Sequence, residues 1–98
     1  MEIIINHGEN MEIVLKGRLD TITSATLQEK FNNEQINENL VIINATDLEY
    51  ISSAGLRVLL TLKKTLNAKQ KAFEIHNLNA VCKEVFKVTG FDNILTVK

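Results

Sequence analysis

Residues 40–60 read LVIINATDLEYISSAGLRVLL, and this stretch decides the fold. Its first five residues form an apolar run rich in β-branched side chains, which is typical of a strand buried on both faces in the middle of a sheet. Behind the serine pair at positions 52 and 53, leucines recur at helical spacing: Leu56, Leu59, Leu60 and, further on, Leu66. We therefore predict a central strand over residues 40–44, a short polar loop, and a helix that begins at the two serines.

Strand and helix patterns flank this unit on both sides. Residues 3–6 and 11–17 are β-rich, and the Gly and Asn between them suit a tight turn, which predicts an antiparallel opening pair. A helix capped by Thr21 or Thr23 follows to about residue 33, and another capped by Asn79 runs to about residue 88. Residues 72–76 and 94–97 read as later strands. Because the alternation from residue 40 onward requires crossover connections, we predict an α/β fold with about four to five strands, mostly parallel after the first pair, and about three to four helices.

Composition and length favour a binding protein over an enzyme. The 98 residues are 45% apolar and 23% charged, which predicts one domain over residues 1–98 with little room for a deep active-site cleft. The formal net charge is −1 with no Lys/Arg cluster, which argues against direct nucleic-acid binding. No segment approaches the roughly 18 to 20 apolar residues that span a bilayer, and the N-terminus lacks a basic region, so we expect a cytoplasmic protein without membrane insertion.

Residue patterns for catalysis or metal binding are absent from the sequence. His7 and His76 have no Cys, Asp or Glu at a ligand spacing, so we expect no metal site and no cofactor. The serine pair lacks a Gly-x-Ser-x-Gly context and a motif-placed His/Asp pair, which argues against a hydrolase. The single cysteine, Cys82, reads as a small core residue.

A serine at the start of a helix has two plausible roles. As an N-cap it accepts a backbone N–H and contributes about 1 kcal/mol, so Ser53→Ala is expected to lose roughly that amount. As a phosphate acceptor it exploits the unpaired N–H groups and the dipole of the helix N-terminus, and about two new negative charges would repel a bound partner. The small Ala54 and Gly55 would let another protein approach this helix end closely.

Two motifs resemble the STAS family of anti-sigma factor antagonists. They are ISSAGLRVLL, residues 51–60, and GRLD, residues 17–20, which is similar to the family's Gly-x-Leu-Asp segment. The order of strands and helices matches a STAS-like fold over essentially the whole chain. The family pattern Asp-Ser-x-Gly-Leu implies that Ser53 is phosphorylated, with Ser52, which stands where the family commonly has aspartate, as second choice. It also brings Asp20 near the acceptor, although a polar turn or helix-cap role for Asp20 is equally open.

The resemblance implies a partner-switching cycle. The unmodified protein would bind an anti-sigma factor that is also a serine kinase and so release a sigma factor; phosphorylation of Ser53 would break the complex, and a phosphatase would restore it. The alternatives are a docking STAS subunit of a lipid-transport ATPase in a membrane, and a small-ligand or nucleotide sensor, which the lack of a Gly-rich phosphate loop disfavours. The expected partner-binding residues are Asp20, Tyr50, Ser52, Ser53, Ala54, Gly55 and Arg57.

Overall fold

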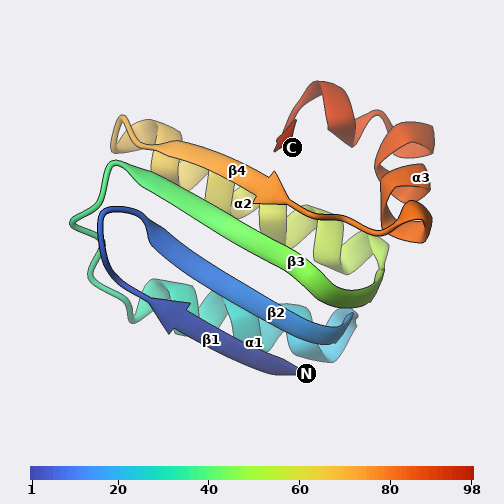
Figure 1. The fold of residues 1–98 in the computed structure, drawn as a ribbon, viewed down its shortest axis with the longest axis horizontal. Coiled ribbons are helices and arrows are strands. Elements are labelled where there is room, and N and C mark those ends of the chain that lie inside the picture. Colours follow the sequence, from blue (N-terminus) through green and yellow to red (C-terminus); the bar gives the residue numbers. More distant parts are fainter.

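The computed structural model describes residues 1–98 as a five-stranded sheet with helices packed against it (Figure 1). In chain order the elements are β1 (Glu2–Asn6), β2 (Met11–Leu19), α1 (Thr21–Asn32), β3 (Leu40–Ile51), α2 (Ser53–Ala68), β4 (Ala72–His76), α3 (Ala80–Thr89), a 3-10 turn (Phe91–Asn93) and β5 (Thr96–Val97). The strand order is β1-β2-β3-β4-β5, with β1 antiparallel to β2 and every later pair parallel. The predicted α/β fold, the antiparallel opening pair and the central position of residues 40–44 are confirmed.

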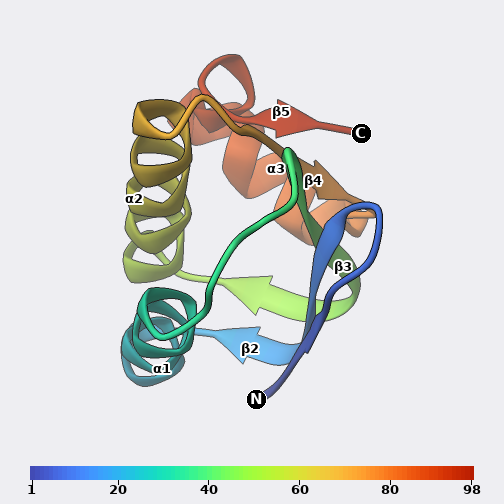
Figure 2. The same ribbon diagram turned by 90° about the vertical axis from the view of Figure 1, so that its left-hand side faces the viewer.

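Helices α1 and α2 cover the same face of the sheet, and α3 lies where β3 and β4 end (Figures 1 and 2). The covered face supplies the core, to which Ile13, Ile43 and Ile75 contribute from three neighbouring strands. Leu40 and Ile42 point to the opposite face and are only half-buried. The prediction that this strand is buried on both faces is therefore wrong, because no helix lies over its second face.

Strand β3 is much longer than its apolar run. It continues through Thr46 and Glu49 to Ile51, where we predicted a polar loop. The backbone partner of this extension is β2, which pairs with β3 as far as Leu19 opposite Ile51, whereas β4 ends opposite Asn44. Backbone pairing with a long neighbour thus keeps a polar segment in the sheet.

The ends of the other elements correct the sequence prediction in detail. The cap of α1 is Asp20, not Thr21 or Thr23, although Thr23 completes a reciprocal capping box with it. Asn79 caps α3 as predicted, and its side chain accepts a hydrogen bond from the Cys82 N–H. The last strand, Thr96–Val97, is shorter than the predicted 94–97, because the N–H groups of Ile94 and Leu95 donate back to the Phe91 carbonyl of a 3-10 turn over residues 91–93.

Candidate functional site

The serine pair lies where β3 passes into α2, beside the end of β2. The Ser52 hydroxyl accepts a hydrogen bond from the Gly55 N–H at 3.2 Å and is therefore the N-cap of α2. The same hydroxyl donates to the Leu19 carbonyl at 3.2 Å, and the Ser52 N–H donates to that carbonyl at 2.9 Å. Ser52 thus fastens the first turn of α2 to the end of the neighbouring strand.

Ser53 is the first residue of α2, and its environment differs from that of Ser52. Its side chain is exposed, whereas that of Ser52 is half-buried. The side-chain hydrogen bonds at this helix end, to Gly55 and to Leu19, are both made by the Ser52 hydroxyl, and the Ser53 hydroxyl takes part in neither. The cap is therefore Ser52, and the expectation that Ser53→Ala removes a cap is wrong.

The N-termini of α1 and α2 lie at the same edge of the sheet, because β2 and β3 are parallel neighbours that end opposite each other. Asp20 caps α1 and accepts hydrogen bonds from the backbone N–H groups of Ile22 at 3.1 Å and Thr23 at 3.0 Å. Hydrogen bonds from Thr23, first from its backbone and then from its side chain, lower the pKa of the Asp20 carboxyl. Of the two open roles for Asp20, the structure therefore shows the helix cap.

Gly55 is buried against its own chain. A Cβ at this position would lie 2.7 Å from Ile51 Cγ1 and 2.8 Å from the Leu19 carbonyl oxygen. The expectation that Gly55 lets another protein approach the helix end closely is thus wrong. The missing side chain of Gly55 instead lets α2 pack against β2 and β3 of the same chain. Ala54 is half-buried beside it, and Leu56 and Leu59 are core residues.

Three larger side chains frame the serine pair. Tyr50 is half-buried at the end of β3, and the Arg18 guanidinium lies 4.5 Å from its ring centroid, within cation–π range. Arg18 lies within the GRLD motif, but sequence reasoning did not assign it a role, because its contact with Tyr50 joins two different strands. Arg57 is exposed on α2, one turn after Ser53. The structure thus brings all the predicted partner-binding residues to one edge, with Gly55 beneath its surface.

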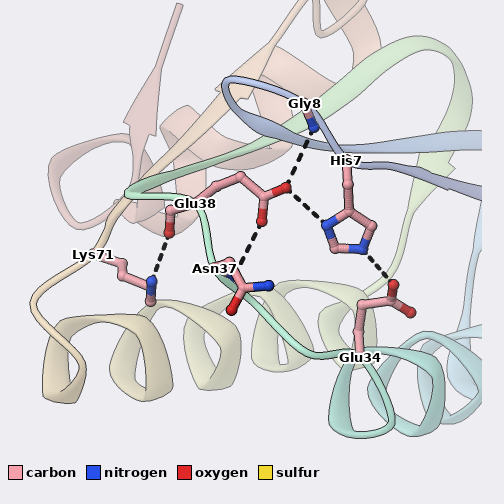
Figure 3. A network of polar contacts seen from close by, with 6 residues as sticks. All are labelled: His7, Gly8, Glu34, Asn37, Glu38 and Lys71. Carbon is pink, nitrogen blue, oxygen red and sulfur yellow. Dashed lines mark hydrogen bonds and ion pairs between the residues drawn. The ribbon is translucent and has the colours of Figure 1, made fainter.

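A second polar cluster lies at the opposite end of the sheet, around His7 (Figure 3). His7 Nε2 is 2.5 Å from Glu34 Oε1, and Nδ1 is 2.8 Å from Oε2 of the buried Glu38, which also accepts from the Gly8 N–H. Hydrogen bonds to Glu34 and then to Glu38 raise the pKa of His7. The carboxylates approach different ring nitrogens instead of one common point, so the cluster joins the β1–β2 turn to the segment before β3.

The surface near the serine pair offers no enclosed binding site, since no pocket is found in the structure. No group of three or more His, Cys, Asp or Glu side chains is arranged to hold a metal ion. None of the helices combines the length and apolarity needed to cross a bilayer.

Known proteins share this arrangement of strands and helices. The anti-sigma-B factor antagonist of Listeria monocytogenes is 26% identical over 99 residues, covering 100% of this chain and 87% of that protein. The unphosphorylated form of the anti-sigma factor antagonist SpoIIAA superposes with a TM-score of 0.84 at 20% identity, over 99% of this chain and 88% of that one. The phosphorylated form of the Bacillus cell fate determinant SpoIIAA superposes with a TM-score of 0.71 at 19% identity, over 99% and 91% of the two chains. At these identities the structural likeness shows the fold.

The family follows from the sequence match. Residues 3–98 match the model of the STAS domain, which is nearly the whole chain. The motif residues that prompted the resemblance have defined structural roles here. Gly17 adopts a positive φ of 107° at a shift in the β2–β3 register. The Leu19 carbonyl accepts a hydrogen bond from the Ser52 hydroxyl, and Asp20 caps α1. The chain therefore belongs to the STAS domain family, with anti-sigma factor antagonists among its relatives.

Proposed function

We propose that this protein is an anti-sigma factor antagonist that binds an anti-sigma factor with serine kinase activity, and that phosphorylation of Ser53 ends the binding. The relatives named anti-sigma factor antagonists support the class of partner. The protein acts in this proposal by binding and not by catalysis, in the cytoplasm, and the ATP site belongs to the kinase.

The choice of Ser53 as the acceptor rests on the different environments of the two serine hydroxyls. The Ser52 hydroxyl holds the helix cap and the Leu19 carbonyl, so a phosphate there would disrupt the start of α2. The Ser53 hydroxyl is exposed and makes neither contact. A kinase can therefore modify Ser53 without unfolding the helix, which favours Ser53 over Ser52 as the acceptor.

The phosphoryl transfer in this proposal uses ATP bound to the partner. The bond between the γ-phosphorus and its bridging oxygen breaks, a bond from that phosphorus to Ser53 Oγ forms, ADP leaves, and the hydroxyl proton passes to a base of the kinase. The product carries about two negative charges at a helix N-terminus, where the helix dipole favours an anion. The fold is kept while the binding surface changes its charge, which is what a reversible switch requires.

The serine at position 52, in place of the family's aspartate, does not remove the cap. Serine and aspartate are both strong N-caps, and Ser52 caps α2 through its hydroxyl. What the chain lacks is a carboxylate next to the acceptor. We infer that the kinase recognises this helix end through other groups, among them Asp20 and Tyr50.

The proposal is tested with purified baits bearing wild type, Ser53→Asp or Ser53→Ala in a lysate of the native organism. Wild type and Ser53→Ala should retain a serine kinase of the anti-sigma factor class, and Ser53→Asp should lose it. When radiolabelled ATP is added to the retained complexes, wild type should take up label and Ser53→Ala should not. A Ser52→Ala bait is the matched control and should still accept label.

Two results would contradict the proposal. Label on the Ser53→Ala chain would assign the phosphate to another residue. Retention of a transport ATPase by both wild type and Ser53→Asp, without labelling, would instead support the docking subunit of a membrane transporter.

A further inference from the structure

Helix α2 presents an exposed face that carries positive charge and no negative charge. Residues 53–68 contain no Asp or Glu, and their charged side chains are Arg57, Lys63 and Lys64. Ser53 and Arg57 are both exposed and four residues apart. Side chains at this spacing lie on the same face of a helix, about 5 to 6 Å apart at their Cβ atoms.

Arg57 has no anionic partner in the structure. The four ion pairs join His7 to Glu34 and Glu38, and His76 and Lys98 to Glu74, and none of them involves a residue of α2. The helix neighbours of Arg57 at spacings of three and four are Ser53, Ala54, Leu60 and Thr61, and none is acidic. The guanidinium is therefore free to take up an anion that appears on this face.

The direction of α2 favours pairing between Arg57 and an anion at position 53. Helical side chains lean toward the N-terminus, so a side chain as long as that of Arg57 can reach the turn that contains Ser53. An anion four residues before a cation is the more favourable order of such a pair, and it agrees with the helix dipole. The guanidinium also offers a planar set of donors that suits two oxygens of a phosphate.

We propose that Arg57 binds the phosphate on Ser53 within the same helix, and so acts as a positioning residue of the switch. The proposal rests on the proposed function for its place in regulation. Unmodified, the protein presents Arg57 to a carboxylate of the partner; modified, it withdraws that cation and presents a phosphate. A phosphate on Ser52 would lie five residues from Arg57, outside the spacing of neighbours.

The pairing is measured on the full chain with phosphoserine incorporated at position 53 during synthesis, so that no kinase is needed. Phosphorus NMR follows the second ionisation of the phosphate, which for phosphoserine lies near pH 6. With Arg57 present we expect the titration midpoint about 0.3 of a pH unit lower than in Arg57→Gln, as for an exposed helical pair worth roughly twofold in its equilibrium constant. Arg57→Lys should restore part of this difference, and 1 M salt should reduce it.

Two other cations serve as comparisons. Lys64→Gln removes an exposed cation further along α2 and should leave the midpoint unchanged. Arg18→Gln removes the cation held over Tyr50, the other candidate to meet the phosphate. Equal midpoints in wild type and Arg57→Gln, or a shift in Arg18→Gln in its place, would overturn the proposal.

The experiment separates this inference from the proposed function. If the phosphate pairs with Arg57 but the baits retain no kinase, the pair stands and the regulatory role falls. If a kinase labels Ser53 but Arg57→Gln leaves the midpoint unchanged, the switch stands and Arg57 has no part in holding the phosphate.

Discussion

The two serines at the start of α2 should respond differently to removal of the hydroxyl. Ser52→Ala deletes the acceptor of the Gly55 N–H and the donor to the Leu19 carbonyl. The Leu19 carbonyl keeps its bond from the backbone N–H of residue 52, but the N–H of the buried Gly55 loses its partner. An N-cap costs about 1 kcal/mol, and a buried unsatisfied donor moves the cost toward the upper part of its range, so we expect a loss of about 1 to 2 kcal/mol. Ser53→Ala removes an exposed hydroxyl without these contacts and should change the free energy of unfolding by less than about 0.5 kcal/mol.

Urea unfolding followed by circular dichroism measures both values. With a slope of about 1 to 3 kcal/mol per M, a loss of 1 kcal/mol lowers the urea midpoint by about 0.3 to 1 M. Ser52→Asp is the rescue variant for the cap: aspartate can accept from the Gly55 N–H but cannot donate to the Leu19 carbonyl, so it should be more stable than Ser52→Ala. If Ser53→Ala destabilised the protein as much as Ser52→Ala, the assignment of the cap would be wrong, and with it the argument that Ser53 is free to be modified.

Three further predictions concern other parts of the molecule. Gly55→Ala should destabilise the protein by about 1 to 3 kcal/mol in the same assay, because its Cβ would lie 2.8 Å from the Leu19 carbonyl oxygen. Gly8→Ala, whose Cβ would lie 3.8 Å from its nearest atom, should cost less, and equal losses in the two variants would contradict the packing argument. His7 has a raised pKa in the folded protein, so the stability that its charged form contributes should be present below about pH 6.5 and lost as the pH rises through that raised pKa. The difference in free energy of unfolding between wild type and His7→Gln should therefore shrink as the pH rises through this window. A difference that stays constant with pH would refute the role of the charge. Cys82 is fully buried and burial raises the pKa of its thiol, so a thiol reagent should modify it in urea but not in the native protein; rapid native modification would place it at the surface.

The elements of the fold were predictable because their signals are local. The apolar run at residues 40–44, the leucine spacing of α2 and the Asn79 cap each lie within one element, and the structure confirms all three. The extension of β3 was not predictable from its own residues, since Thr46 and Glu49 read as polar loop. Its cause is the length of β2, which offers backbone partners as far as Leu19.

The site was predictable in its position but not in its division of roles. The sequence offers two adjacent serines as caps; in the structure the Gly55 N–H selects Ser52, and the Leu19 carbonyl, 33 positions before Ser52, also accepts a hydrogen bond from its hydroxyl. The role of Gly55 likewise depends on Leu19, and the contact between Arg18 and Tyr50 joins two strands. The contacts of Leu19 with Ser52 and Gly55, and that of Arg18 with Tyr50, join segments that are distant in sequence, and local patterns therefore did not reveal these roles.

The two helix N-termini at this edge differ in charge, and the difference favours α2 over α1 as the place of the proposed phosphate. At α1 the Asp20 carboxylate already occupies the position that faces the helix dipole. At α2 the cap is the neutral Ser52, and the first turn has no acidic residue, so the positive end of the dipole meets no charge. An aspartate at position 52 would place a carboxylate beside the phosphate on Ser53 and oppose it. In the proposed phosphorylated state, the serine at position 52 would leave the dipole and Arg57 to act on the phosphate without that repulsion, so the departure from the family pattern is compatible with the proposed modification of Ser53.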